Sequence, residues 1–198
     1  MLILASASPR RRELLTQAGF SFQVHPAHIP EALLKGEDAL TYVTRLAREK
    51  AETVFRELTE AKATAGDASL QGETLAVLGA DTTVTLDDHI LEKPVDAADA
   101  ARMLRLLSGR IHRVITGVAL VTAEEAEVAA ETTAVRFMEL SEEDIAAYVA
   151  TGEPMDKAGA YAIQGRAACW IPRIEGCYFN VVGLPLALVA RLLKSRGM

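Results

Sequence analysis

The sequence predicts an α/β domain with a mixed sheet. Short apolar segments typical of strands alternate with segments whose apolar residues recur at helical spacing, and two adjacent β-rich segments in the middle resemble a hairpin. Of the 198 residues, 50% are hydrophobic and only 5% aromatic, which suits an α/β core rich in Ala, Val and Leu. No apolar run approaches the ~20 residues of a membrane span.

The chain begins with the pattern of a strand, a turn and a helix. Residues 2–5 form a short apolar run that predicts a buried strand. Ser8 is a good N-cap, Pro9 fits the first helical position, and Gly19 is a natural stop. A second strand is expected at residues 20–24.

A long amphipathic helix and a strand pair follow. Asp38 is placed to cap the helix, whose apolar residues continue to Val54. Residues 74–86 are apolar and β-branched, and we expect Gly79-Ala80-Asp81 to interrupt this strand. A returning strand is expected to end at residues 92–94.

The second half of the chain contains similar capping residues and strand-like segments. Asp96 caps a helix that Gly109 stops, and residues 112–123 and 127–140 predict an antiparallel pair. Ser141 starts another helix with a near capping box.

The end of the chain combines a glycine-containing loop with apolar segments. Residues 152–165 predict a long loop and residues 169–174 a strand. Residues 180–197 predict one apolar helix with basic residues in its last turn, where the helix dipole favours them.

Composition limits the possible functions. The net charge of −6 argues against a general nucleic-acid or membrane-surface binder, so an anionic ligand must meet a local basic cluster. The apolar run at the N-terminus is too short for a signal peptide, and we expect a cytoplasmic protein. Cys169 and Cys177 show no metal-ligand spacing and are expected to be reduced thiols.

The stretch LASASPRRREL is a candidate anion site. Helix N-termini expose backbone N–H groups at the positive end of the dipole, where arginines are mildly unfavourable unless an anion binds. Arg10, Arg11 and Arg12 lie there together with Ser6 and Ser8. We expect two of the three arginines to face a phosphate ligand, although a solvated basic turn is the alternative.

Further candidates lie along the chain. Asp81 is a carboxylate at the expected end of a buried strand, which favours metal binding or general-base work, with capping of the next turn as the alternative. Lys50 and Lys93 could clamp a phosphate or be solvated charges. The amide of Gln164 has the donor and acceptor needed to read a base edge.

Six stretches of the sequence form a specific pattern; in chain order they are LASASPRRREL, LGADTTV, LEKP, MLRLLSGRIHRVITGVAL, EPMDKAGAYAIQG and NVVGLPL. Together they closely resemble the Maf-like nucleoside triphosphate pyrophosphatases. The YAIQG stretch resembles the subfamily that hydrolyses dTTP and UTP. The resemblance implies a single domain over residues 1–198, with a long twisted mixed sheet flanked by helices and two lobes with a cleft between them.

The resemblance also implies a reaction and its residues. Water would attack the α-phosphorus of a nucleoside triphosphate, assisted by a divalent metal cation, Mg²⁺ or Mn²⁺, and release the monophosphate and pyrophosphate. The family's catalytic base falls on Asp81, and its metal ligands on Glu31 and Asp81. Its phosphate-binding residues fall on Ser6, Arg10, Arg11, Lys50 and Lys93. Its specificity positions fall on Arg11, Thr82 and Gln164.

The partners expected from the resemblance are a nucleoside triphosphate substrate and a second copy in a homodimer, with no membrane and no stable nucleic-acid partner. The expected role is the cleaning of nucleotide pools, including modified pyrimidine nucleotides, with a link to cell-division arrest. The alternative is a non-catalytic nucleotide- or nucleic-acid-binding regulator of septum formation. A nucleotide monophosphatase or an inosine-triphosphate-type pyrophosphatase is a further alternative.

Overall fold

A computed structural model describes residues 1–65, 75–87 and 89–197. The chain divides into two compact units. The first unit comprises Met1–Asp81, Gly117–Ala130 and Gly183–Met198, and the second comprises Thr82–Thr116 and Glu131–Val182.

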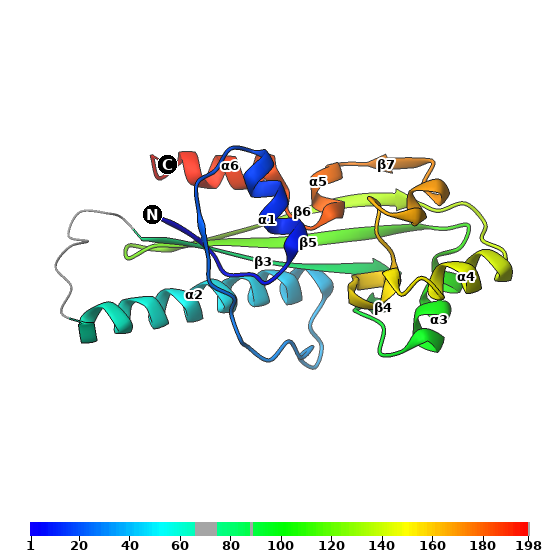
Figure 1. Cartoon of the computed structure of the whole chain (residues 1–198), viewed down its shortest axis with the longest axis horizontal. Coiled ribbons are helices and arrows are strands. Elements are labelled where there is room, and N and C mark those ends of the chain that lie inside the picture. Colours follow the sequence, from blue (N-terminus) through cyan, green and yellow to red (C-terminus); the bar gives the residue numbers. More distant parts are fainter. Residues whose placement is uncertain (66–74, 88, 198) are drawn as a thin grey trace. The chain divides into compact units, whose positions relative to one another are not determined.

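The first unit contains the anion-site candidate of the N-terminus. Its complete elements are β1 (Leu2–Leu4), α1 (Pro9–Gln17), β2 (Gln23–Val24), α2 (Ala39–Ala65) and α6 (Leu186–Lys194). Strand β1 pairs in parallel with β2 on one side and with β3 (Ala76–Leu86) on the other. Helices α1 and α6 lie on one face of these strands and α2 lies on the other (Figure 1).

Three long strands contribute residues to both units. They are β3 (Ala76–Leu86), β5 (Ile111–Val121) and β6 (Ala126–Arg136). Within the described residues the sheet has seven strands in the order β2-β1-β3-β5-β6-β7, where β7 covers Arg173–Glu175, and β4 (His89–Leu91) lies beside β3. Strands β3 and β4 are antiparallel, as are β6 and β7, whereas β1 has parallel neighbours. The prediction of a mixed sheet flanked by helices is confirmed.

The second unit carries the loop that contains Gln164. Its complete elements are β4 (His89–Leu91), α3 (Ala97–Leu107), α4 (Glu142–Val149), β7 (Arg173–Glu175) and α5 (Tyr178–Val182), with 3-10 helices η2 (Glu153–Asp156), η3 (Ala158–Ala160) and η4 (Arg166–Trp170). Its core includes Leu104, Phe137, Ile145 and Tyr161, which come from α3, α4 and the segments around β6 and η3.

The helix starts predicted from local chemistry are confirmed. Helix α1 begins at Pro9 behind Ser8, as predicted, although the Ser8 side chain makes no capping hydrogen bond. The Asp38 carboxylate accepts from Thr41 N–H at 2.7 Å before α2, and Asp96 caps α3 in the same way. Ser141 and Asp144 form a full capping box at α4.

The expected interruption of β3 is wrong, because the strand runs unbroken from Ala76 to Leu86 and Asp81 lies in its middle. Gly79 has another purpose: a Cβ there would collide with the carbonyl oxygen of Ala47 in α2. Glycine in a strand often marks such a close backbone approach. Gly79 therefore marks the place where α2 packs closely against β3, and not the end of the strand.

Three apolar segments near the ends of the chain also differ from expectation. Residues 166–170 form a 3-10 helix, so the last strand covers only Arg173–Glu175, and the early strand at 20–24 shortens to Gln23–Val24. Periodicity cannot separate a short strand from a short helix. The closing helix breaks at Gly183, whose φ is 118°, before Pro185, because proline restricts the preceding residue and lacks an N–H.

None of the helices in the described part of the chain combines the length and apolar character needed to cross a membrane.

A buried histidine lies in the core of the second unit. The ring of His112 is 5.0 Å from that of Phe137 and 5.3 Å from that of Tyr161, both edge to face. Burial disfavours the charged imidazolium and lowers the pKa of His112 from 6.5 to about 3. The side chain is therefore neutral in the folded protein at neutral pH.

This pKa predicts a loss of stability in mild acid. The unfolded chain protonates His112 near pH 6.5, whereas the folded chain does so only near pH 3, so falling pH favours unfolding between these values. His112 should account for about 2 kcal/mol of lost unfolding free energy between pH 7 and pH 5. Urea unfolding at both values should show a smaller difference for His112→Phe. An equal difference in both proteins would contradict the assignment.

Candidate functional site

Ser6 lies in the connection between β1 and α1. It is buried, and its Oγ accepts from the backbone N–H of Ser8 at 3.3 Å and from Nη1 of Arg11 at 3.1 Å. The hydroxyl is thus held in front of the N-terminus of α1, where backbone N–H groups and the positive end of the dipole favour an anion. Its own O–H hydrogen is a donor that such an anion can accept.

Arg11 points inward rather than toward solvent. Its Nε donates to the carbonyl oxygen of Gly183 at 2.8 Å, and Nη1 also donates to the carbonyl oxygen of Ala80 at 2.9 Å. Burial lowers the pKa of Arg11, and the charge of Asp81 opposes that shift. Its neighbour Arg10 is half-buried and Arg12 is exposed. Arg11 therefore binds three parts of its own chain, while its contact with a phosphate ligand stays a prediction.

Two carboxylates share one buried ammonium group. Lys50 Nζ lies 2.7 Å from Asp81 Oδ1 and 2.5 Å from Glu31 Oε1. The side chains of Lys50 and Asp81 are 8% and 11% exposed, whereas that of Glu31 is 45% exposed. The three charges come from α2, β3 and the segment between β2 and α2, so the fold of the first unit assembles them.

Asp81 has the electrostatics of a proton acceptor. Burial raises its pKa, the charges of Lys50 and Arg11 counteract that shift, and Glu31 adds to it. A carboxylate with a raised pKa is a stronger base than an ordinary surface aspartate. Its position in the middle of β3 also holds it on a rigid element.

The packing of α2 places Lys50 beside Asp81. Ala47, Lys50 and Val54 lie on the buried side of α2 at helical spacing. The helix backbone reaches the strands at two glycines, since a Cβ at Gly79 or Gly117 would collide with a carbonyl oxygen of the helix. Without this close approach the lysine stem would hold its ammonium farther from β3.

The segment with Glu31 is tied to the same helix. Tyr42 donates from its hydroxyl to the carbonyl oxygen of Glu31 at 3.0 Å, and Arg45 Nη2 donates to that of Ala32 at 3.0 Å. Arg45 also pairs with both oxygens of Glu37. The backbone at Glu31 is therefore fixed although its side chain is half exposed.

Three other candidates belong to the second unit. Thr82 shares a hydrogen bond of 2.9 Å with Thr116, and both hydroxyls are polar groups inside the sheet. Lys93 is exposed and lies two residues beyond Leu91, the last residue of β4. Leu91 itself pairs with Val84 of β3. Gln164 is exposed in the turn between η3 and η4.

Sequence reasoning missed several supporting groups. The carbonyl of Gly183 and the hydroxyl of Tyr42 carry no pattern that would link them to Arg11 or Glu31. Gly79 did carry a signal, since glycine within a strand indicates close approach. The partner proves to be a helix rather than a ligand.

The donor set of Asp81 and Glu31 fits a divalent cation. Within the described ranges no group of three or more His, Cys, Asp or Glu side chains is placed to hold a metal ion. Mg²⁺, however, is commonly held by one or two carboxylates together with substrate phosphates. Lys50 Nζ lies between these two carboxylates, so a metal ion held by both would take the place of this ammonium group.

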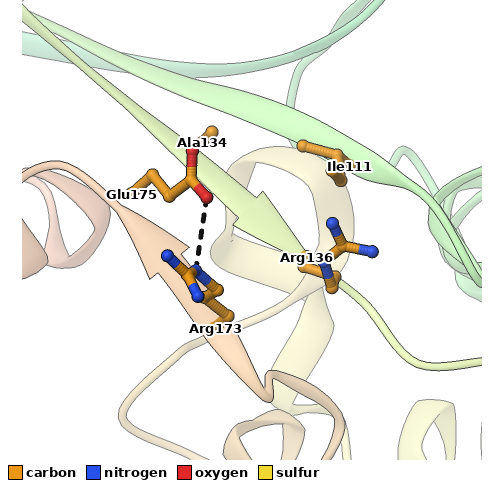
Figure 2. Close-up of a pocket in the computed structure, with 5 residues that line it drawn as sticks. All are labelled: Ile111, Ala134, Arg136, Arg173 and Glu175. Carbon is orange, nitrogen blue, oxygen red and sulfur yellow. Dashed lines mark ion pairs between the residues drawn. The ribbon is translucent and has the colours of Figure 1, made fainter.

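A small hollow on the second unit does not serve as this site. It is lined by Ile111, Ala134, Arg136, Arg173 and Glu175, and its volume of about 20 Å³ holds one or two water molecules (Figure 2). Arg173 and Glu175 form an ion pair of 3.2 Å at its edge. None of the candidate residues lines it.

Arg11→Ala is expected to destabilise the protein. The change leaves the carbonyl groups of Ala80 and Gly183 without their guanidinium donor, and each unsatisfied buried group costs about 1–3 kcal/mol. Arg12→Ala, at an exposed position of the same helix turn, should change the unfolding free energy by less than about 0.5 kcal/mol. Equal denaturation midpoints for the two variants would rule out the anchoring contacts of Arg11.

Gly79→Ala is expected to push α2 away from β3. Overpacking of this kind costs about 1–3 kcal/mol, and here the colliding atom belongs to helix backbone, which adjusts poorly. Thermal unfolding measures the effect. Gly36→Ala provides a contrast: that glycine meets no neighbouring atom but has a φ of 79°, so its substitution costs backbone strain alone, whereas Gly79→Ala costs the steric collision. A melting temperature unchanged by Gly79→Ala would show that α2 has room to move.

Comparison with known proteins identifies the family of the chain. The family described as Maf-like protein matches residues 1–196. A relative from Koribacter versatilis is 53% identical over 197 residues, covering 100% of this chain and 95% of its own. A relative from Salmonella typhimurium is 52% identical over 193 residues, which cover 98% of this chain and 91% of the relative. A relative from Symbiobacterium thermophilum is 50% identical over 196 residues, which cover 99% of this chain and 94% of the relative. Each is named a dTTP/UTP pyrophosphatase. With nearly every residue matched, the chain belongs to the Maf family.

Proposed function

We propose that this protein hydrolyses nucleoside triphosphates, dTTP and UTP above all, to the monophosphate and pyrophosphate. The relatives that carry the name dTTP/UTP pyrophosphatase match the whole chain at about half identity. The structural observation that carries the proposal is the buried group of Asp81 and Lys50 beside Ser6 and the N-terminus of α1. That group combines a proton acceptor, Asp81, with an anion-binding site.

The phosphate groups of the substrate are proposed to bind at the start of α1. Arg10 and the backbone N–H groups there supply positive charge, and Ser6 supplies a hydroxyl donor. Lys50 adds an ammonium group from α2, and Lys93 is a further proposed ligand of the phosphates. Arg11 contributes charge, but its hydrogen bonds to Ser6, Ala80 and Gly183 give it mainly the task of holding these parts together.

Asp81 is proposed to act as the base. A water oxygen attacks the α-phosphorus while its proton passes to the Asp81 carboxylate. The bond from the α-phosphorus to the bridging oxygen breaks, and pyrophosphate leaves with that electron pair. The raised pKa of Asp81 makes the carboxylate a better acceptor for that proton.

A divalent cation, Mg²⁺ or Mn²⁺, is part of the proposal. Asp81 and Glu31 would hold it together with phosphate oxygens, since carboxylates suit both metals. When bound, the cation neutralises phosphate charge and polarises the phosphoryl group.

We propose that Gln164 and Thr82 of the second unit select the nucleobase of the substrate, with Arg11 as a further specificity position. The amide of Gln164 can donate to the 4-oxo group and accept from the N3–H of uracil or thymine. We further propose that residues 1–198 work as one domain, as a homodimer in the cytoplasm, without a nucleic-acid partner. A purely binding role in septum formation would leave a buried carboxylate with raised pKa beside the anion site unexplained.

The proposal is tested with a panel of nucleoside triphosphates and Mg²⁺ or Mn²⁺. Pyrophosphate and monophosphate are measured separately. The proposal expects equal amounts of both from dTTP and UTP. Release of inorganic phosphate alone would indicate a phosphatase, turnover of inosine triphosphate in preference to pyrimidines would indicate the other pyrophosphatase class, and binding without any product would favour the regulatory role.

Asp81→Asn is expected to lower kcat by about 10²–10⁴-fold, because the amide keeps the shape of the side chain but cannot take a proton. Pyrophosphate release from dTTP measures the loss. Asp87→Asn, at the exposed end of the same strand, removes a carboxylate that pairs with Arg110 and should retain full activity. Near-normal turnover by a folded Asp81→Asn protein would refute the assignment.

A further inference from the structure

The turn that carries Gln164 is connected to the core of the second unit by a buried hydrogen bond. His112 lies on β5 and Tyr161 directly precedes the turn at residues 162–165. Nε2 of His112 and the hydroxyl of Tyr161 are 2.7 Å apart, and both side chains are buried. The two rings also pack edge to face at 5.3 Å.

A second pair of polar side chains holds the same turn from α4 and η2. The hydroxyl of Tyr148 accepts from Ala162 N–H at 3.2 Å and donates to Glu153 Oε1 at 2.8 Å. Glu153 Oε2 accepts from Arg166 N–H at 3.4 Å. The backbone is thus bonded on both sides of Gln164.

The turn itself leaves little room for adjustment. Gly165 N–H donates to the carbonyl oxygen of Ala162 at 3.0 Å and closes the turn. A Cβ at Gly165 would collide with the carboxylate of Glu153, so the chain passes directly over that side chain. Only Gln164 of this turn is exposed, with Ala162, Ile163 and Gly165 half-buried.

Core packing alone does not account for His112 and Tyr161. Nδ1 of His112 is buried without a hydrogen-bond partner, and burying such an atom is unfavourable. Phenylalanine at both positions would occupy similar space with no polar atom left over. A polar pair that stabilises the core less well than an apolar one indicates a requirement for a defined orientation.

We propose that His112 and Tyr161 are positioning residues for base selection, whose hydrogen bond fixes the turn at 162–165 and thereby the amide of Gln164. This inference rests on the proposed function, in which that amide reads the pyrimidine edge. A side-chain amide that can rotate would accept cytosine as well, since cytosine presents an acceptor at N3 and an amine donor at position 4. A fixed backbone does not stop the amide from rotating about its own last bond, but it holds the amide at one distance from the pyrimidine edge. It also fixes the backbone N–H and C=O groups of the turn, whose donor and acceptor directions cannot be exchanged and so favour the 4-oxo pyrimidines.

The decisive variant is Tyr161→Phe, which removes one hydroxyl and keeps the ring. We expect the ratio of kcat/KM for UTP to that for CTP to fall by about three- to tenfold, mainly through a higher KM for UTP. Inhibition by inorganic tripolyphosphate, which has no base, should stay unchanged. Ile145→Val, a change in the same core that touches no polar contact of the turn, should lower the melting temperature without altering the ratio.

The double variant His112→Phe with Tyr161→Phe separates positioning from stability. Replacing both partners by apolar rings removes the unpaired polar atom, so the melting temperature should recover relative to Tyr161→Phe. The selectivity should remain low, because the turn is still without its hydrogen bond. Recovery of the selectivity together with the melting temperature would overturn the inference and leave the pair with a structural role only.

Other results distinguish the inference from the function on which it rests. If Gln164→Ala changes the nucleotide profile while Tyr161→Phe does not, the inference is wrong and the proposed function stands. If tripolyphosphate inhibition weakens in Tyr161→Phe to the same degree as UTP turnover, the pair supports the whole protein rather than base selection, and the inference is again wrong. If the unmodified protein releases no pyrophosphate from any nucleotide, the proposed function itself fails.

Discussion

The buried ion pair of Lys50 and Asp81 depends on the contact of α2 with the strands, and the proposed chemistry depends on that pair. The helix backbone lies so close to β3 and β5 that only glycine fits at positions 79 and 117. Because the lysine stem has a limited reach, this spacing decides whether the ammonium meets the carboxylate at 2.7 Å. Removing one partner of a buried ion pair typically costs about 3–5 kcal/mol, so the fold and the site are linked at this point.

The first unit holds several charges away from water and satisfies them within the chain. Arg11 bonds two backbone carbonyls and Ser6, while Lys50 contacts two carboxylates. Apolar side chains of similar size would often be at least as stabilising. The cluster is better explained by what it prepares: a base with a raised pKa next to positive charges, on strands and helices that hold it in place.

The second unit uses mostly uncharged polar side chains for a comparable purpose. Tyr148 and Tyr161 reach from the core to the turn around Gln164, and His112 stays neutral because burial lowers its pKa. The carboxylate of Glu153 belongs to the same set of contacts, since it accepts from Tyr148 and from the backbone of Arg166. The proposed phosphate site in the first unit and the proposed nucleobase site in the second unit are thus held by different kinds of contact.

The sequence by itself determined the alternation of strands and helices, the starts of α1, α2, α3 and α4, and the family, because capping residues, proline positions and short motifs act within a few residues of one another. It also singled out Asp81, Lys50 and Ser6 as candidates. It did not show that β3 continues through Gly79, that the last helix breaks at Gly183, or that Arg11 turns inward while Arg12 stays exposed. Those outcomes depend on contacts between segments far apart in the chain, such as Arg11 with Gly183, 172 positions away. Three identical arginines carry no local signal of which one is buried, so only the packing of α1 against β3 and the segment before α6 decided it.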